Sequence, residues 1–483
     1  MRSLWWPVLA LWAGSAWAGA AEDAKIAERM IEQNRLEPAL VLLDRAIGSG
    51  ELSPKELGGA YFNRGAIYKL FGEKERALAE FERAISVHSE PWAPMYGRAL
   101  LLNQMGRYED ALLAYDQAIA ESDHSAPARY NRGLLRQRLD KLDEALEDYD
   151  AAIRLEPKLE SAFMNRGVIY YSKHNYDAAL ADFSRLIELN PRNAKAYHHR
   201  GKILAWRKQS YESAIEDFST AVALQPGFAA AYTDRGLAYA TLKKFDLAEP
   251  DLNEAVRLSP GEAPPLYNRG SAYMMMEDFE RAVRDLTTAL RLDPAHVAAV
   301  VNRGEAYLRM GQPEKAVADL SRALVARPNH PSLLMRRGEA YFELERFKEA
   351  ILDFARVSVA RPDSAEPWRW MGDAHYELGD YAQAESNYTS YIVRNNRSDT
   401  IHFSRGVARF KLGKLEDAIK DFTEASIRDP ENGAAYYNRG VCLEKLERLV
   451  AAEEDFKKAK ELDPSISSKA AGKLKELRLQ RQS

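Results

Sequence analysis

The 483-residue sequence contains one cysteine, Cys442. A single cysteine cannot close a disulfide within the chain, so packing has to hold the fold together. Neither sign of charge dominates, because 68 basic residues stand against 72 acidic ones and the formal net charge is −4. A nucleic-acid-binding surface needs a basic excess. The composition therefore predicts no nucleic-acid partner.

Motifs that would support catalysis are also missing. The sequence has no phosphate-binding loop, no glycine-rich dinucleotide turn and no Gly-x-Ser-x-Gly elbow. Its histidines are scattered, and the adjacent His198 and His199 would point in different directions on a helix, which disfavours a metal site. No pair of carboxylates is placed for acid–base chemistry. We expect no enzyme activity, no cofactor and no metal.

Only the first residues form a markedly apolar run. Arg2 supplies a positive charge, residues 4–13 are apolar and rich in tryptophan, and the segment ends with an Ala-x-Ala spacing at Ala18. This layout is typical of a secretory signal peptide, residues 1–18, whose apolar part is short for a membrane span. We expect cleavage after Ala18, with Ala20 as the alternative site and an uncleaved anchor as the other interpretation. The mature chain would then have no membrane span and would be exported, to a periplasm first and to the extracellular space second.

One repeated pattern fills most of the chain. Arg-Gly pairs recur at a 34-residue spacing with one 35-residue step. An alanine follows each glycine by twelve residues, except that Ala214 follows Gly201 by thirteen, and a large apolar residue stands four positions after each alanine. Small residues suit close helix crossings, the large residue fills the space between the helices, and a closing proline ends the second helix. Each unit is predicted to be two amphipathic helices that bury their apolar faces only by stacking on neighbouring units. The repeat glycines are Gly65, Gly133, Gly167, Gly201, Gly236, Gly270, Gly304, Gly338, Gly372, Gly406 and Gly440, with Ala99 at the midpoint of the first interval.

The 34-residue period with large-x-x-x-Gly-x-x-Tyr, then Ala-x-x-x-Phe and a closing proline, resembles the tetratricopeptide repeat. The resemblance covers residues 59–464 as twelve units and implies an all-α fold, a right-handed α-solenoid superhelix of stacked helix-turn-helix repeats. A diverged unit at residues 20–53 makes about thirteen repeats, and residues 465–483 are predicted to form a C-terminal capping helix. The family's fold is a binding scaffold used in many settings, so the resemblance names no partner.

Arginine precedes the repeat glycine in eleven of twelve units, and an acid recurs just before the large apolar residue of the second helix. One unit lacks both and carries Met371 and Asn387 instead. This joint loss predicts an Arg–carboxylate pair across the two helices of each unit. The alternative is a row of arginines that binds an anionic ligand. Examples of the predicted pairs are Arg166 with Asp182, Arg269 with Asp285 and Arg303 with Asp319.

The resemblance also implies that the first helix of each unit lines an inner groove, where a partner would lie. Asparagine recurs there two residues before the repeat glycine, at Asn63, Asn131, Asn165, Asn268, Asn302 and Asn438. This is similar to the asparagine ladder in the repeat array of O-linked N-acetylglucosamine transferases, although no transferase domain follows here. An amide offers donors and an acceptor to a peptide backbone. The other interpretation is a tolerated polar surface residue.

Large apolar residues stand beside these asparagines and mark a candidate interaction surface. The alternative is that they pack against neighbouring first helices. They are Phe62, Tyr96, Tyr130, Tyr171, Tyr267, Met274, Leu308, Phe342, Tyr376, Phe403, Phe410 and Tyr437.

Three successive units carry an acid directly after the repeat glycine, namely Glu305, Glu339 and Asp373, and Glu343 and Glu377 follow one helical turn later. Stacked repeats should bring these into one acidic patch, only partly offset by Arg309 and Arg336. We predict that the patch accepts a Lys- or Arg-bearing segment of a partner. The alternative is a solvated charged face.

The sequence thus predicts a non-catalytic scaffold that binds extended or helical segments of partner proteins in its concave groove, in an envelope assembly or adaptor role. Residues 338–396 are the favoured binding region, because the unit of Trp368 and Trp370 deviates most from the repeat. The alternative function is a glycan-binding or polysaccharide-export subunit in which these two tryptophans stack on sugars. Nothing in the sequence decides the oligomeric state.

Overall fold

A computed structural model describes residues 19–395 and 399–480. The described residues form 27 α-helices and no strand. The chain divides into two compact units, Met1–Pro226 and Gly227–Ser483. The predicted signal peptide, residues 1–18, lies outside the described residues.

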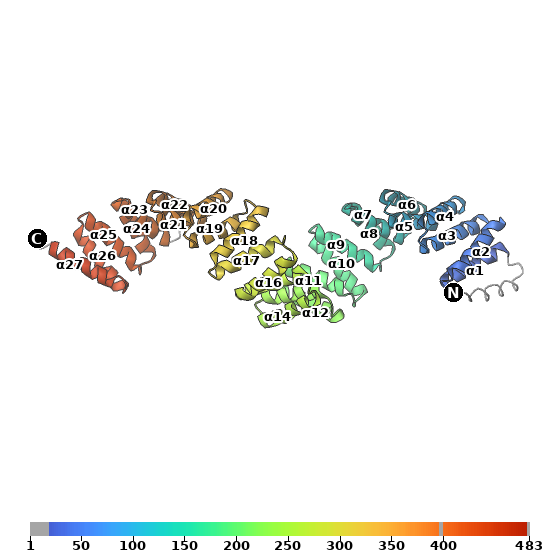
Figure 1. The fold of residues 1–483 in the computed structure, drawn as a ribbon, viewed down its shortest axis with the longest axis horizontal. Helices are drawn as coiled ribbons and strands as arrows, with labels where there is room; N and C mark the ends of the chain where they lie inside the picture. The colour runs from blue at the N-terminus through green and yellow to red at the C-terminus, as the bar shows by residue number, and fades with distance from the viewer. Residues whose placement is uncertain (1–18, 396–398, 481–483) are drawn as a thin grey trace. The chain divides into compact units, whose positions relative to one another are not determined.

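The first unit consists of helix pairs that follow one another along the chain (Figure 1). We call the first helix of each pair helix A and the second helix B. The helices are α1 (Ala20–Glu32), α2 (Leu36–Ser49), α3 (Pro54–Leu70), α4 (Lys74–Val87), α5 (Trp92–Gln104), α6 (Tyr108–Glu121), α7 (Ala126–Arg138), α8 (Leu142–Leu155), α9 (Glu160–Ser172), α10 (Tyr176–Leu189), α11 (Ala194–Trp206) and α12 (Tyr211–Leu224).

The second unit repeats this arrangement and ends with a single helix, α27. Its helices are α13 (Ala229–Thr241), α14 (Phe245–Leu258), α15 (Ala263–Met275), α16 (Phe279–Leu292), α17 (Val297–Arg309), α18 (Pro313–Ala326), α19 (Pro331–Glu343), α20 (Phe347–Ala360), α21 (Glu366–Glu377), α22 (Tyr381–Arg394), α23 (Asp399–Lys411), α24 (Leu415–Arg428), α25 (Gly433–Lys445), α26 (Leu449–Leu462) and α27 (Ser467–Gln480). The prediction of an all-helical array of paired helices is confirmed, and 27 helices fit about thirteen repeats.

A tight turn joins helix A to helix B in every pair. Each of these turns contains one residue with positive φ, which is glycine in five pairs, as at Gly72, and another residue in eight, as at Asp140 and His174. A non-glycine residue in this conformation costs roughly 1–2 kcal/mol. Packing of the two helices must therefore offset local strain in most repeats.

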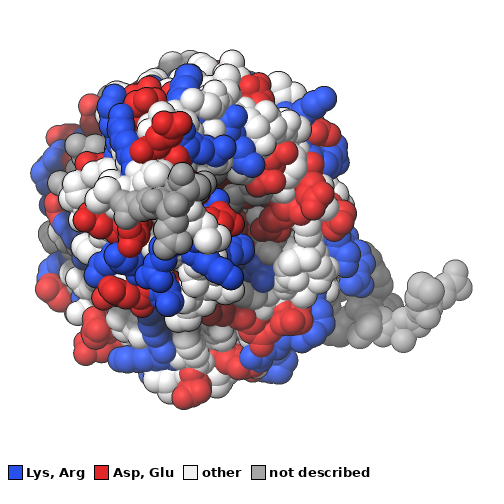
Figure 2. Space-filling view, turned by 90° about the vertical axis from the view of Figure 1, so that its left-hand side faces the viewer, with Lys and Arg blue, Asp and Glu red and all other residues white. Residues whose placement is uncertain are grey.

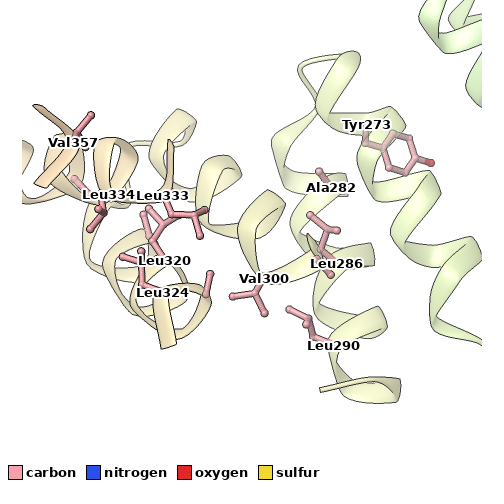
Figure 3. Packing of buried hydrophobic residues seen from close by; sticks show 14 residues of the cluster. Tyr273, Ala282, Leu286, Leu290, Val300, Leu320, Leu324, Leu333, Leu334 and Val357 are labelled. Carbon is pink, nitrogen blue, oxygen red and sulfur yellow. The ribbon is translucent and has the colours of Figure 1, made fainter. Parts of the chain in front are cut away.

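The repeat positions form the core of each unit. The alanine twelve residues after the repeat glycine is fully buried in most units, and so is the large residue after it, as at Ala350 and Phe354. Glycine is required beside that ring, because a Cβ built on Gly338 would lie 2.6 Å from Cε1 of Phe354. Figure 3 shows buried residues of α15–α20, with Leu286 near Val300 and Leu320 near Leu333 and Leu334.

The last helix packs on the final repeat. In α27, Ala470 and Leu477 are buried, and Leu477 belongs to a cluster with Leu443 and Phe456. This helix therefore covers apolar surface of the α25–α26 repeat. None of the helices in the described part of the chain combines the length and the apolar character that a membrane span requires.

Candidate functional site

The arginine before each repeat glycine reaches across to helix B of its own unit. Arg303 binds Asp319 with two parallel hydrogen bonds, Nε to Oδ2 at 2.7 Å and Nη2 to Oδ1 at 2.8 Å. The hydrogen bond to Asp319 raises the pKa of Arg303, so the guanidinium stays charged. The pairs Arg166–Asp182 and Arg269–Asp285 have the same geometry, and their carboxylates are 3% and 8% exposed.

The same guanidinium groups also reach back to helix B of the preceding repeat. Nη1 of Arg166 lies 2.6 Å from Oδ1 of Asp150, and Nη1 of Arg303 lies 3.2 Å from Oγ1 of Thr287. We call this arrangement the arginine staple, because one side chain joins three helices of two repeats. Further examples are Arg132–Asp116, Arg200–Ser184, Arg269–Asn253, Arg337–Ser321, Arg405–Thr389 and Arg439–Thr423. Since protein acceptors occupy the guanidinium groups, this geometry favours a structural role over an anion-binding row.

The pair α21–α22 has no staple. Met371 and Asn387 stand in place of the arginine and the acid and are both buried, while Ala355 stands where the preceding repeat supplies the third member. The acceptor on the preceding helix B was not found from the sequence. In the sequence, this acceptor can be recognised as a serine, threonine, asparagine or aspartate that stands sixteen residues before most of the staple arginines. Arg98 is another departure, since it donates to Oε1 of Gln117 rather than to a carboxylate.

The six predicted asparagines are half-buried on helix A and several connect neighbouring repeats. Nδ2 of Asn131 donates to the hydroxyl of Tyr96 at 2.7 Å and to the carbonyl of Pro127 at 2.9 Å. Asn165 donates to the Tyr130 hydroxyl at 3.0 Å. Asn131 therefore uses both of its amide hydrogens within the protein, and only its carbonyl oxygen remains for a peptide.

The remaining asparagines differ from one another. Asn302 donates to Oγ of Ser271 at 3.0 Å, across neighbouring helices A, and Asn438 donates to the carbonyl of Ala434 at 2.8 Å. Asn63 and Asn268 make no side-chain hydrogen bond with the described residues. Several of the predicted asparagines therefore form hydrogen bonds between neighbouring repeats. The side-chain amides of Asn63 and Asn268 are the ones that remain available to a ligand.

The predicted large apolar residues are half-buried rather than fully exposed. Residues three positions before the repeat glycine pack on the large residue of helix B, as Tyr130 does on Tyr149 with ring centroids 5.8 Å apart. Tyr171 packs at 5.7 Å on Tyr176, and Tyr267 lies 4.5 Å from the ring of His296. These contacts account for part of the set as packing residues.

One subset recurs on five successive helices A of the second unit. We call it the helix A row: Met274, Leu308, Phe342, Tyr376 and Phe410, at one repeat position on α15, α17, α19, α21 and α23. Side-chain contacts join neighbouring helices A beside it, as Arg336 on α19 contacts Glu305 on α17. Each member packs one side on the core and leaves the other partly open.

The acidic patch is less negative than the sequence indicates. Arg336 bridges two members, with Nε 3.1 Å from Oε2 of Glu305 and Nη1 2.9 Å from Oε2 of Glu339. Asp373 accepts a hydrogen bond from the hydroxyl of Tyr388 at 2.8 Å and lies 3.3 Å from Nη1 of Arg369. Glu305 and Glu339 are therefore brought together but paired, and Asp373 is engaged with its own repeat.

Two other carboxylates of the predicted patch have no ion-pair partner in the described part of the chain. Glu343 and Glu377 are exposed and have no ion pair with a described residue. Partial loss of solvation raises the pKa of Glu343, and the charge on Glu339 adds to this rise. Each acid directly follows a member of the helix A row, Phe342 or Tyr376. An apolar group with an adjacent free acid is thus presented twice, both times within residues 338–396.

The two tryptophans of the deviant repeat are covered by other side chains. The ring of Trp370 stacks on Phe354 with centroids 5.8 Å apart, and the guanidinium of Arg369 lies 4.4 Å above it. The guanidinium of Arg394 lies 4.6 Å above the ring of Trp368. Sugar stacking needs an open ring face, so this geometry does not favour the glycan-binding alternative. Figure 2 shows acidic and basic residues intermingled on the visible face, without a large area of one sign.

Family models agree with the repeat geometry. A model described as the tetratricopeptide repeat matches residues 71–126, 202–263, 267–331, 302–367, 371–422 and 403–465, and a second model of that description matches residues 126–159 and 161–193. No curated protein matches the chain.

Several solved structures are similar to the chain. One is a tetratricopeptide repeat protein from Parabacteroides merdae, at 20% identity and TM-score 0.39, covering 52% of this chain and 98% of that one. Another is YrrB, described as a TPR protein with an unusual peptide-binding site. It has 26% identity and a TM-score of 0.34, and the match covers 39% of this chain and 96% of that one. A third is PilW, described as a widely conserved type IV pilus biogenesis factor. It has 18% identity and a TM-score of 0.40, and the match covers 42% of this chain and 94% of that one. Because the family models match well over half of its residues, the chain belongs to the tetratricopeptide repeat family.

Proposed function

We propose that the chain is a scaffold that binds an extended or helical segment of a partner protein along the helix A row. The observation that carries this proposal is the row itself, five half-buried apolar side chains at one repeat position on five successive helices A. The fold of this family supports a protein-interaction role. Partly open apolar groups beside polar ones suit a segment whose side chains complete their burial.

The chemistry beside the row defines the partner segment. Free carboxylates at Glu343 and Glu377 attract lysine or arginine, whereas the paired acids Glu305 and Glu339 contribute less. The free amide of Asn268 can meet the segment's backbone. The expected ligand therefore carries apolar residues with basic neighbours.

We also propose that the chain is exported, in an envelope assembly or adaptor role. The layout of residues 1–18 supports this. Helix α1 begins at Ala20 with Gly19 as its N-cap, so cleavage after Ala18 would keep the helix whole, whereas cleavage after Ala20 would remove its cap. The intact mass of chain recovered from a periplasmic extract should correspond to an N-terminus at Gly19. Recovery of the full-length chain from the membrane fraction would contradict export by cleavage.

The groove proposal is tested by capture with matched baits. The chain from residue 19 onward serves as one bait, and Glu343→Lys with Glu377→Lys as the other. Because both side chains are exposed and unpaired, the reversal should leave folding intact and reduce recovery of the partner by about tenfold. Quantitative mass spectrometry of the eluates measures this ratio.

Two further baits make the result specific. Glu147→Lys with Glu216→Lys reverses two exposed acids on helices B of the first unit and should not change recovery. Phe342→Ala removes a member of the helix A row and should lower recovery, with circular dichroism confirming that helix content is unchanged. A partner that is recovered equally by all four baits would show that it binds elsewhere on the chain.

A further inference from the structure

A second row of apolar residues lies on helices B, away from the helix A row. We call it the helix B row: Val325 on α18, Val359 on α20, Val393 on α22 and Ile427 on α24. The residues occupy one repeat position, 34 residues apart, and their side chains are 83%, 80%, 79% and 66% exposed. They take no part in the core, so the fold does not require them to be apolar.

Five other repeats carry an exposed charged residue at this position, namely Arg154, Glu188, Arg257, Arg291 and Glu461. Three more carry Ser86, Ala120 and Ala223, which are also exposed. The position is thus solvent-facing along the chain and is charged or small in these eight repeats, whereas four consecutive repeats carry a β-branched aliphatic side chain. Four exposed aliphatic side chains that recur at one position of successive repeats are a candidate interaction surface.

A depression adjoins the row on α20. It has a volume of about 830 Å³, and its lining includes Leu352, Ala355 and Val359 along one face of the helix, with Arg337 and Tyr341 from α19. Leu352 is 66% exposed, two helical turns before Val359. The depression can therefore receive a side chain of a segment that lies along the row.

Arginines border the row without acidic partners. Arg322, Arg327, Arg361 and Arg394 are exposed, and none has a carboxylate within 4.0 Å among the described residues. Arg322 donates to the carbonyl of Pro294, and Arg394 donates to the carbonyl of Pro362 at 2.7 Å. Neutral carbonyls leave the positive charge of Arg322 and Arg394 uncompensated, whereas the carboxylates Asp353 and Glu349 in the lining of the depression are paired with Arg337 and Arg346.

We propose that the helix B row is a docking surface for an acidic amphipathic segment of a partner protein. Its aliphatic side chains would cover Val325, Val359, Val393 and Ile427, and its Asp or Glu residues would pair with the bordering arginines. A protein segment fits better than a membrane, because the row has no tryptophan or tyrosine of the kind that anchors proteins at lipid interfaces. This surface is separate from the groove and takes a partner of opposite charge.

The test is selection of random phage-displayed peptides on the chain from residue 19 onward. The selected peptides should combine aliphatic with acidic residues and should bind about tenfold more weakly to Val359→Glu with Val393→Glu, as measured by fluorescence anisotropy. Glutamate occupies the same repeat position at Glu188 and Glu461, so the variant should fold. Leu113→Glu with Leu247→Glu changes exposed leucines elsewhere and should leave binding unchanged.

Other results would overturn the proposal. One is a selection that yields no acidic-aliphatic peptide, or only peptides that bind both variants as well as the unchanged chain. A second is row-dependent binding of phosphatidylserine-containing vesicles, which would assign the surface to a membrane. A third is a dimer in light scattering that Val359→Glu with Val393→Glu dissociates, which would assign it to a second copy of the chain.

Discussion

Replacing Asp319 with alanine should destabilise the α17–α18 repeat by about 3–5 kcal/mol, because it leaves the partly buried guanidinium of Arg303 without its carboxylate. The carboxylate is 6% exposed and accepts both parallel hydrogen bonds from that arginine. Hydrogen exchange of the backbone amides in α17 and α18 should accelerate more than in distant repeats, since contacts in such arrays run between neighbours. Exchange monitored by mass spectrometry, together with urea denaturation, measures the loss.

The chain itself offers the control for this change. Arg303→Met with Asp319→Asn installs the residue types found at Met371 and Asn387, so the double variant should recover most of the lost stability. If Asp319→Ala alone cost less than about 1 kcal/mol, the pair would be a surface ion pair in energetic terms. If the double variant were no better than the single one, the pair would not be the reason for the loss.

Replacing Phe354 with alanine should cost about 3–5 kcal/mol, the usual range for emptying a large buried site. The ring is 0% exposed, stacks on Trp370 and lies against Gly338, which has no side chain to fill the space. The cavity would lie between two repeats and loosen α19–α22, where Phe342 and Tyr376 of the helix A row are located. Urea denaturation followed by circular dichroism measures the loss, and capture of the groove partner should fall with it.

Phe183→Ala provides the comparison in the first unit. Its ring is equally buried and contacts Gly167 in the same way, so the loss of stability should be similar. Capture of a partner that binds the helix A row should nevertheless persist. Loss of capture in both variants would place the binding site outside the row or show that it depends on the whole chain.

The fold was predictable because the same small and large packing residues recur in each repeat. Small residues such as Gly338 and Ala350 and a large one such as Phe354 recur at fixed spacing, and only stacked helix pairs bury them all. The Arg–carboxylate pairs were predictable for another reason, since Met371 and Asn387 replace both partners in one repeat. The third member of the staple was missed because serine, threonine, asparagine and aspartate all serve there and form no single-letter pattern.

The candidate site was only partly predictable. Repeat register placed Glu305 and Glu339 near each other, but it could not show that one arginine, Arg336, spans both carboxylates. The engagement of Asp373 by the hydroxyl of Tyr388 likewise depends on how far a side chain on helix B extends. The helix B row was not predicted, because its aliphatic residues occur in only four repeats and lie at a solvent-facing position outside the repeat pattern. A repeat-by-repeat comparison of solvent-facing positions would have found it.

The missing staple at α21–α22 gives this joint a different response to temperature. Apolar contacts, such as the stack of Trp370 on Phe354, join α21 to the preceding repeat. At the same place, most other repeats have an arginine staple that joins three helices. Apolar burial contributes less to stability as temperature falls, and among the described residues this joint has no guanidinium hydrogen bonds to the preceding helix B to add to it. Cooling should therefore soften this joint before the stapled ones. The free acids Glu343 and Glu377 lie on α19 and α21, on either side of this joint.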